Sequence, residues 1–336
     1  MQSLATVVAD VKEGRRPPWP CHPRPSDLKL LTRPQTDELT EVSAFGGNPG
    51  DLRMLKAVPG PLRRSAPLVV VLHGCGQTAA DIDTGGGWSA LAAKCGFALL
   101  LPEQRRSNNP QRGFNWFRPL DVRRDSGEAL SIRHMIERMI LDHGLDRKRV
   151  FIAGLSAGGA MTGAMLAAYP EMFAGGAIIA GLPYGVASNV WQAVAAMKSP
   201  PQIPSEILGE KVKAASGNEG PWPKLSIWHG GADTTVSPAN ADAIARQWLN
   251  VHGLSEDAAF ATRVKGQTRL SWHDASGAAK VESFIIPGMA HGAPVDVAAK
   301  KGKSYGSAGP FFEDAAISST YHIAKFWGLK QRWRSL

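Results

Sequence analysis

Hydrophobic and polar positions along the chain alternate between short apolar runs and longer segments with an apolar residue every three or four positions. The short runs predict buried strands at 68–72, 97–101, 150–153, 175–180, 225–230 and 281–286. The longer segments predict helices at 88–95, 126–143, 239–251 and 317–329. Because strands and helices alternate, we predict an α/β fold with a mostly parallel, doubly wound sheet and helices on both faces.

The regular pattern does not cover the whole chain. Residues 1–40 begin with a stretch rich in Pro and Arg and predict an N-terminal arm, whereas residues 41–336 predict a single α/β domain. Strand-like segments on either side of a turn at 48–50 predict an antiparallel hairpin that leads into strand 68–72. Pro, Gly and Ser interrupt the pattern at 181–223, where we predict a small cap-like insertion between two strands.

One junction between a strand and a helix carries a candidate nucleophile. Strand 150–153 runs into Gly154-Leu155-Ser156-Ala157-Gly158, and small residues then open a helix. A serine centred in G-x-S-x-G at such a junction is typical of a nucleophile elbow, whose tight turn leaves no room for a Cβ at the flanking glycines. Ser156 is therefore the predicted nucleophile of a hydrolytic reaction. A second G-x-S-x-G, centred on Ser304, lies in a basic loop with no strand before it, so we do not expect it to react.

Two further residues complete a predicted catalytic triad. Asp233 follows strand 225–230, and His291 follows strand 281–286 in a loop rich in glycine. The chain order Ser, Asp, His is that of α/β-hydrolases. Because the carboxyl ends of parallel strands meet at one edge of a sheet, we expect the three side chains to converge there. His291 is then the predicted base, and Asp233 the acid that orients it.

Other residues compete for these roles. His322 lies in the closing helix and is expected to pack or cap there, although it also follows Ser156 in the chain. His229 precedes two glycines, and an alternative role for it is to orient the loop that carries Asp233. Asp296 is an alternative to Asp233, but it follows His291 instead of preceding it.

The loop after strand 68–72 is the second candidate element of the site. It reads His73-Gly74-Cys75-Gly76, which is similar to the H-G-G-G loops of esterases. We expect the backbone N–H of Cys75, with Gly76 as the alternative, to stabilise an oxyanion together with the N–H of Ala157. The side chain of His73 is expected to brace this loop.

The same loop also fits a different class of protein. From Gly74 to Ala79 the chain reads G-x-G-x-x-A after a strand, and Glu103 ends the next strand, where an acid that binds ribose would lie. An NAD-dependent oxidoreductase is therefore one alternative. A catalytically inactive hydrolase fold that only binds its ligand is another.

Composition narrows the environment and the partners. The net charge of +9 is spread over separate basic clusters, which we interpret as solvated surface and not as a nucleic-acid site. The three cysteines (Cys21, Cys75 and Cys95) do not suggest a disulfide framework. No apolar run approaches the ~20 residues of a membrane span, and the first residues do not resemble a secretory signal. We expect a cytoplasmic protein, or a secreted one if a leader was removed, with no metal or organic cofactor.

Together these segments resemble the poly(3-hydroxybutyrate) depolymerase-type esterases, which are α/β-hydrolases related to feruloyl and acetylxylan esterases. The resemblance covers roughly residues 45–330. Its carriers are L-V-V-V-L-H-G-C-G-Q-T-A-A-D at 68–81, L-P-E-Q at 101–104, F-N-W-F-R-P at 114–119, G-L-S-A-G-G-A-M at 154–161, G-L-P-Y-G at 181–185, H-G-G-A-D-T-T-V at 229–236, P-G-M-A-H-G at 287–292 and S-S-T-Y-H-I-A-K-F-W-G-L at 318–329.

The resemblance implies a serine esterase that acts on carboxylic esters. Its implied residues are Ser156, Asp233 and His291 as the triad, Cys75 and Ala157 at the oxyanion, and Trp116 near the mouth of the site. The implied substrate is 3-hydroxybutyrate polymer or oligomer, and the alternatives are feruloyl, acetylxylan or simple short-chain esters.

Two features of the pocket follow from the same resemblance and from the insertion. Many relatives carry a cysteine before F-N-W-F that pairs with the one in H-G-C, but that position is Gly113 here, so this disulfide cannot form. The difference agrees with a reducing compartment. Tyr184, Trp191 and Trp222 are expected either to line an acyl pocket or simply to pack within the insertion.

Overall fold

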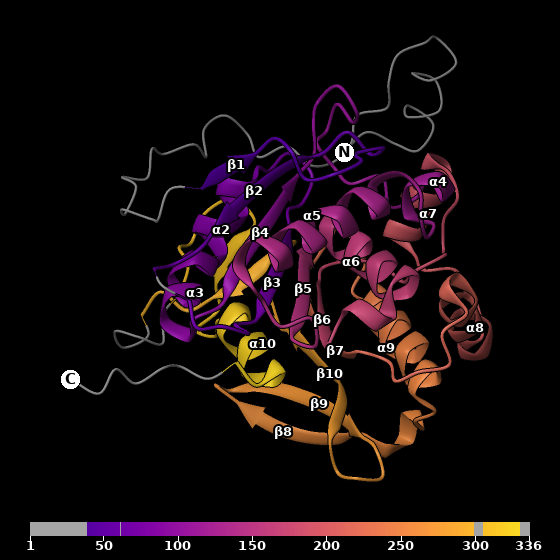
Figure 1. The fold of residues 1–336 in the computed structure, drawn as a ribbon. Coiled ribbons are helices and arrows are strands. Elements are labelled where there is room, and N and C mark those ends of the chain that lie inside the picture. Colours follow the sequence, from indigo (N-terminus) through magenta and orange to yellow (C-terminus); the bar gives the residue numbers. More distant parts are fainter. Residues whose placement is uncertain (1–38, 61, 299–304, 330–336) are drawn as a thin grey trace. The chain divides into compact units, whose positions relative to one another are not determined.

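The computed structural model describes residues 39–60, 62–298 and 305–329. These residues contain a central ten-stranded sheet (Figure 1). In chain order its strands are β1 (Thr40–Val42), β2 (Arg53–Ala57), β3 (Leu68–Leu72), β4 (Ala98–Glu103), β5 (Val150–Leu155), β6 (Gly175–Ile179), β7 (Lys224–Gly230), β8 (Phe260–Val264), β9 (Gln267–His273) and β10 (Ala279–Ile286). In space the order is β1-β2-β4-β3-β5-β6-β7-β10-β9-β8.

The central part of the sheet is parallel. Neighbours from β4 through β10 pair in parallel, whereas β1, β2, β8 and β9 add antiparallel margins on the two sides. Strands β3, β5 and β6 are buried along their whole length, as expected for parallel strands that are covered on both faces. The mostly parallel sheet confirms the predicted α/β class.

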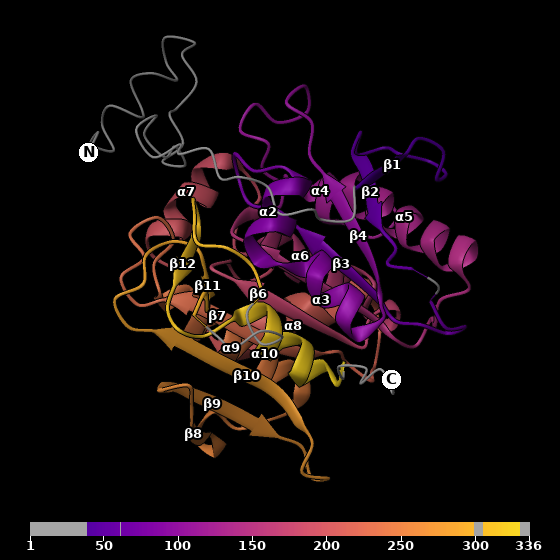
Figure 2. The same ribbon diagram turned by 90° about the vertical axis from the view of Figure 1, so that its left-hand side faces the viewer.

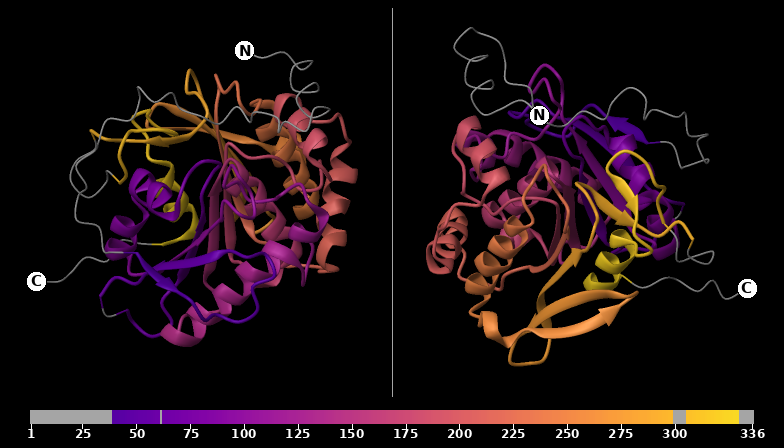
Figure 3. Two further views of the ribbon diagram at one scale, coloured as in Figure 1. Left: turned by 90° about the horizontal axis from the view of Figure 1, so that it is seen from above. Right: turned by 180° about the vertical axis from the view of Figure 1, so that it is seen from behind.

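Helices cover both faces of this sheet. They are α2 (Ala79–Gly86), α3 (Trp88–Cys95), α4 (Pro119–Val122), α5 (Gly127–His143), α6 (Ala157–Ala168), α7 (Val190–Lys198), α8 (Ser205–Ser216), α9 (Ala239–His252) and α10 (Ser319–Trp327). Helices α2, α3 and α10 lie on one side of the sheet, and α5, α6 and α9 lie on the other (Figures 1 and 3). In this part of the chain, no helix is long and apolar enough to cross a membrane.

Three regions differ from the sequence interpretation. The β1–β2 hairpin is antiparallel as predicted, but β2 pairs with β4 and not with the strand that follows it. Residues 79–86 form α2, which was not predicted. The start of this helix is defined by a capping box between Thr78 and Asp81 and not by a periodic apolar pattern. The hairpin of β8 and β9 continues the sheet beyond β10, and it too was not predicted (Figure 2).

The interrupted segment 181–223 contains the two helices α7 and α8. Helix α8 packs against α6 and α9, and its apolar side chains Leu208 and Val212 are buried. The cap-like role of this segment stays a prediction, as does the division of the chain at residue 40, because residues 1–38 lie outside the described ranges.

A small parallel pair lies apart from the main sheet. Strands β11 (Ala293–Val295) and β12 (Phe312–Asp314) pair just after the loop that carries His291 (Figure 2). Phe311 precedes β12, and its ring meets the imidazole of His291 edge-on at 6.3 Å between ring centroids. The pair therefore fixes a second segment beside the candidate base.

Candidate active site

Ser156 stands at the turn between β5 and α6 with an unusual backbone conformation. Its φ is 56° and its ψ is −116°, a region that residues other than glycine rarely adopt. A Cβ added to Gly154 would lie 2.2 Å from the carbonyl oxygen of Gly158, and one added to Gly158 would lie 2.2 Å from that of Leu72. The two glycines therefore allow the close approach that the predicted elbow requires.

Ser156, His291 and Asp233 form a continuous chain of hydrogen bonds. Oγ of Ser156 lies 2.9 Å from Nε2 of His291, and Nδ1 of His291 lies 2.7 Å from Oδ2 of Asp233. Because the carboxylate accepts from Nδ1–H, Nε2 of a neutral imidazole is left to accept the hydroxyl proton. The three side chains come from loops after three different parallel strands, and they have the arrangement of a nucleophile, a base and an orienting acid.

Asp233 is buried and its carboxylate is fully hydrogen-bonded. Oδ1 accepts from the backbone N–H groups of Thr235 and Val236 at 2.8 and 2.9 Å, and Oδ2 accepts from His291. Burial by itself raises the pKa of Asp233, but hydrogen bonds from His229, His291 and the backbone outweigh it and hold that pKa well below its ordinary value. The acid therefore stays ionised beside the base.

His229 is a second histidine in contact with Asp233. It is fully buried at the end of β7, and its Nε2 lies 3.2 Å from Oδ2 of Asp233 and 2.9 Å from the carbonyl oxygen of Val236. Both partners are acceptors, so Nε2 carries the proton. His229 thus braces the Asp233 loop, which is the alternative role that the sequence left open for it.

The loop from His73 to Gly76 is held by several hydrogen bonds. Nε2 of His73 accepts from the N–H of Gln104 at 3.1 Å, so Nδ1 carries the proton and donates to the carbonyl oxygen of Gly74 at 2.8 Å. Burial lowers the pKa of His73, which keeps the ring neutral. His73 therefore braces the loop, as expected.

The amides of this loop discriminate between the two candidate oxyanion donors. The N–H of Gly74 donates to Oε1 of Gln77 at 2.8 Å, and the N–H of Gly76 donates to the carbonyl oxygen of Gln111 at 2.7 Å. Gly76 is thus engaged elsewhere, which favours Cys75. A Cβ added to Gly113 would lie 2.5 Å from Sγ of Cys75 and 3.5 Å from Cβ of Ala157, so these two residues are close neighbours.

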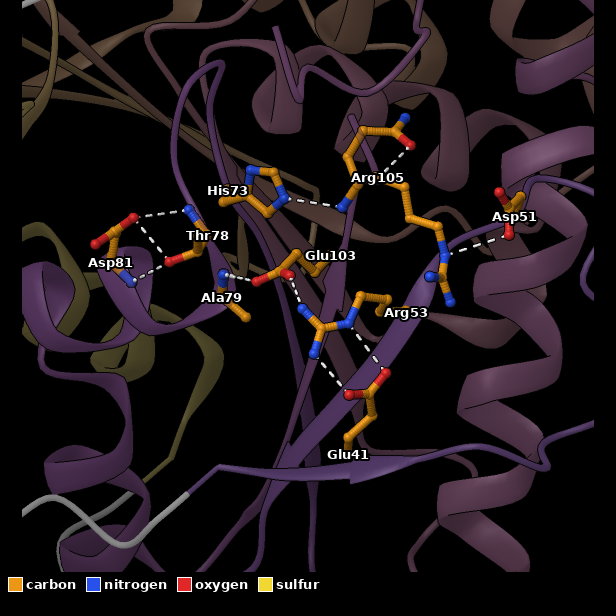
Figure 4. Close-up of polar contacts among 10 residues, drawn as sticks. Glu41, Asp51, Arg53, His73, Thr78, Ala79, Asp81, Glu103 and Arg105 are labelled. Atoms are coloured by element: carbon orange, nitrogen blue, oxygen red, sulfur yellow. Dashed lines mark hydrogen bonds and ion pairs between the residues drawn. The ribbon is translucent and has the colours of Figure 1, made fainter. Parts of the chain in front are cut away.

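The N-terminus of α2 is occupied by protein carboxylates, which argues against a dinucleotide site there (Figure 4). Glu103 is buried; it accepts from the N–H of Ala79 at 2.8 Å and forms an ion pair with Arg53. Arg53 also binds Glu41, at 2.6 Å. The acid that the fingerprint would assign to ribose instead caps the helix, where a pyrophosphate would have to bind.

The remaining candidates have other partners or fall outside the described residues. His322 lies on α10, where its ring packs against Trp228 and Phe284. Burial lowers the pKa of His322 to about 4. Asp296 lies 3.4 Å from Nζ of Lys265. Ser304 falls outside the described ranges.

Trp116 and Tyr184 have surroundings of their own. The buried ring of Trp116 packs edge-on against Phe117 at 5.6 Å, three residues after Gly113. The backbone of Tyr184 is held by Gln247, which donates to it and accepts from it at 2.9 Å. Within the described residues, no hydrogen bond or ring contact joins either residue to the triad, so a role for them in binding substrate stays a prediction.

A buried polar cluster beneath the loop was missed by the sequence interpretation. Gln104, Asn109, Asn115 and Glu128 are all less than 10% exposed and are hydrogen-bonded to one another. The available signal was the presence of amide side chains inside the apolar segments L-P-E-Q and F-N-W-F, since buried polar groups require partners.

Residues 53–274 match the family model described as "Esterase PHB depolymerase". The chain belongs to this family. It is 42% identical over 292 residues to poly(3-hydroxyalkanoate) depolymerase C of Paucimonas lemoignei, and the match covers 87% of this chain and 70% of that protein. It is 32% identical over 268 residues to feruloyl esterase B of Talaromyces stipitatus, covering 77% and 73% of the two chains.

The solved structures agree with the fold of this family. An acetyl xylan esterase from Aspergillus awamori superposes with a TM-score of 0.73 at 22% identity, covering 87% of this chain and all of that one. The esterase PHB depolymerase family and this fold together identify the chain as a carboxylic ester hydrolase of the α/β-hydrolase type.

Proposed function

We propose that this esterase hydrolyses the ester bonds of 3-hydroxyalkanoate polymers or oligomers, with Ser156, His291 and Asp233 as its catalytic triad. The observation that carries the chemistry is the unbroken series of hydrogen bonds from Ser156 through His291 to Asp233. The substrate class is favoured by the 42% identity to a poly(3-hydroxyalkanoate) depolymerase over 87% of the chain.

The reaction proceeds through an acyl-enzyme. Oγ of Ser156 attacks the ester carbonyl while Nε2 of His291 takes its proton, and Asp233 stabilises the imidazolium that results. The backbone N–H groups of Cys75 and Ala157 bind the tetrahedral oxyanion. His291 then protonates the leaving alkoxide oxygen, so that the alcohol departs. It later takes a proton from the water that attacks the acyl group and gives it to Oγ of Ser156 as the acid is released.

Substrate contacts are assigned to the loops around the triad. Trp116 belongs to the same loop as Gly113, which neighbours both oxyanion residues, and this supports a place for Trp116 at the mouth of the site. Tyr184 follows β6 in the segment that leads to α7. We propose Trp116 as the firmer contact of the two.

The test compares wild type with Ser156→Ala on four esters: a 3-hydroxybutyrate trimer, p-nitrophenyl butyrate, methyl ferulate and acetylated xylan. We expect wild type to prefer the trimer by kcat/KM and the variant to lose at least about 10³-fold in kcat on each ester that wild type cleaves. Full activity in Ser156→Ala contradicts the proposed mechanism. A preference for ferulate or acetylated xylan keeps the triad but replaces the proposed substrate.

A further inference from the structure

Glu128 is a fully buried carboxylate that the proposed chemistry does not use. It lies in the first turn of α5, and no ion pair joins it to a cation within the described residues. Burial, together with the nearby charge of Asp121, raises its pKa to about 8, and hydrogen bonds from Asn115 and Gln104 oppose that shift. An unpaired charge in such a place is costly, so its surroundings must compensate for it.

Four N–H groups converge on this carboxylate. Oε1 accepts from the side-chain amides of Gln104 and Asn115 at 2.6 Å each and from that of Asn108 at 3.4 Å, and Oε2 accepts from the backbone N–H of Asn115 at 2.9 Å. All four partners are donors, so they stabilise the ionised form and oppose the effect of burial on the pKa of Glu128. The carboxylate therefore joins the beginning of the loop at 104–115 to its end.

The same loop makes the contacts that hold the proposed oxyanion loop. The N–H of Gln104 donates to His73, and the carbonyl oxygen of Gln111 accepts from Gly76. The side chain of Gln104 also donates to the carbonyl oxygen of Gly113 at 3.2 Å, and Gly113 faces the Cys75 side chain. One loop thus binds His73 and Gly76, and its Gly113 lies beside the Cys75 side chain.

We propose that Glu128 is a positioning residue for the oxyanion hole, acting through Gln104 and Asn115. Its carboxylate holds residues 104–115 in the conformation that keeps the Cys75 amide directed at the reacting carbonyl. This inference rests on the proposed function, because it assumes that the Cys75 amide binds the oxyanion.

The turn at Gly50 closes the cluster on another side. A Cβ added to Gly50 would lie 2.5 Å from Cα of Glu128, the N–H of Gly50 donates to Oγ of Ser131 at 2.9 Å, and Asn108 donates to its carbonyl oxygen at 2.9 Å. Because Gly50 packs this closely against Glu128, it shields the carboxylate from water. If a substitution removes one of the Glu128 oxygens, no water molecule can take its place as the acceptor. A change at Glu128 is therefore transmitted to the loop.

Glu128→Gln is the direct test. Its amide keeps one acceptor oxygen but places an NH₂ group against an N–H donor, so one end of the loop is released. We expect kcat to fall about tenfold to a hundredfold, less than the 10²–10³-fold loss on removing an oxyanion donor, with a smaller change in KM. Affinity for an ester-like trifluoromethyl ketone, whose adduct with Ser156 carries an oxyanion, should fall in proportion to kcat/KM.

Glu282→Gln is the matched control. Glu282 is also a buried carboxylate, but it lies on β10 and accepts from Ser226 at 2.8 Å and Arg269 at 2.6 Å. This variant should lose stability while its kcat per folded molecule stays within about twofold of wild type, since the loss does not reach the oxyanion.

The outcomes separate the inference from the proposed function. Wild type that cleaves no ester refutes the proposed function, whereas active wild type with unchanged kcat and inhibitor affinity in Glu128→Gln overturns this inference alone. If Glu128→Gln does not fold, Gln104→Met carries the test. It removes the bonds that the Gln104 side chain donates to Glu128 and Gly113 and those it accepts from Arg105 and Asn108, but it keeps the backbone donor to His73. That variant should show a smaller, parallel loss of kcat and inhibitor affinity, and an unchanged kcat overturns the inference.

Discussion

Cys75 takes part in the proposed chemistry through its backbone N–H, so removing its thiol should not impair activity. Filling the space beside the thiol should impair activity, because it would displace the loop. A Cβ at Gly113 would lie 2.5 Å from Sγ of Cys75. We expect Gly113→Ala to displace the loop and lower kcat about ten- to a hundredfold. Cys75→Ala alone should stay within about twofold of wild type, since the amide is retained.

The double variant Gly113→Ala/Cys75→Ala distinguishes a steric effect from other causes. Without Sγ the added methyl group has space, so kcat should recover most of the loss measured in Gly113→Ala. Steady-state kinetics on p-nitrophenyl butyrate gives all four values. A Cys75→Ala variant as inactive as Ser156→Ala would show that the thiol itself takes part.

His229 tests how the triad acid is held. Its Nε2 contacts both Asp233 and the carbonyl oxygen of Val236, so a side chain that keeps an N–H donor should replace it in part. We expect His229→Leu to lower kcat about tenfold and His229→Gln to lower it less, whereas Asp233→Asn should cost about 10⁴-fold. Equal kcat values for the Leu and Gln variants, at matched folded fraction, would contradict this role.

At the level of elements, two of the three glycines in α6 have opposite expected responses to alanine. A Cβ at Gly158 would lie 2.2 Å from the carbonyl oxygen of Leu72, whereas one at Gly163 would make ordinary contacts with Cδ1 of Ile178 at 3.5 Å and the carbonyl oxygen of Leu182 at 4.0 Å. We expect Gly158→Ala to destabilise the fold by at least about 3 kcal/mol through backbone overlap. Gly163→Ala should instead stabilise it by about 0.5–1 kcal/mol, because alanine favours the helix.

Urea unfolding of both variants and of wild type provides the measurement. Gly163→Ala controls for the general effect of alanine in this helix. Equal stability of the two variants would mean that the strand-to-helix turn tolerates a side chain at position 158, contrary to the close approach described above.

The helices and strands that could be predicted from the sequence are those that bury a regular pattern of apolar residues. The sequence predicted strands β3, β4, β5, β6, β7 and β10 and helices α3, α5, α9 and α10 from apolar runs and periodicity. Helix α2 was not predicted, because it is defined by the Thr78 cap, and neither was α8, because Pro and Gly around it mask a short amphipathic pattern. The β8–β9 hairpin is exposed along much of its length, so its alternation is weak.

The candidate site divides in a similar way. Ser156, Asp233 and His291 were each named because a strand precedes them, and the structure brings them within hydrogen-bond distance. The cluster around Glu128 could not be predicted, since its members meet only when the loop at 104–115 closes on α5. Neighbours of this kind depend on tertiary packing and leave no periodic signal in the chain.

For the molecule as a whole, buried neutral histidines predict acid sensitivity. Burial lowers the pKa of His322 from 6.5 to about 4, and it does the same for His252. Between these values the unfolded chain binds protons that the folded chain does not, so stability falls as the pH decreases from 6.5 to 4. Each residue should contribute about 2–3 kcal/mol of this loss.

His322→Phe separates one contribution from the rest. Phenylalanine keeps an aromatic ring against Trp228, Phe284 and Tyr321 but does not titrate. Its free energy of unfolding should therefore depend less steeply on pH between 6.5 and 4 than that of wild type, and above pH 7 the slopes should agree. Parallel curves over the whole range would contradict the assignment.

The most direct test of Ser156 as the nucleophile is to label the reactive serine covalently and identify the modified residue. Wild type is incubated with a p-nitrophenyl alkylphosphonate, which reacts only with an activated serine, and the modified peptide is mapped by mass spectrometry. We expect one phosphonyl group on Ser156, absent in Ser156→Ala and suppressed by prior addition of a 3-hydroxybutyrate trimer. Modification at Ser304 or another residue, or equal labelling of Ser156→Ala, would contradict the assignment of Ser156 as the nucleophile of this esterase.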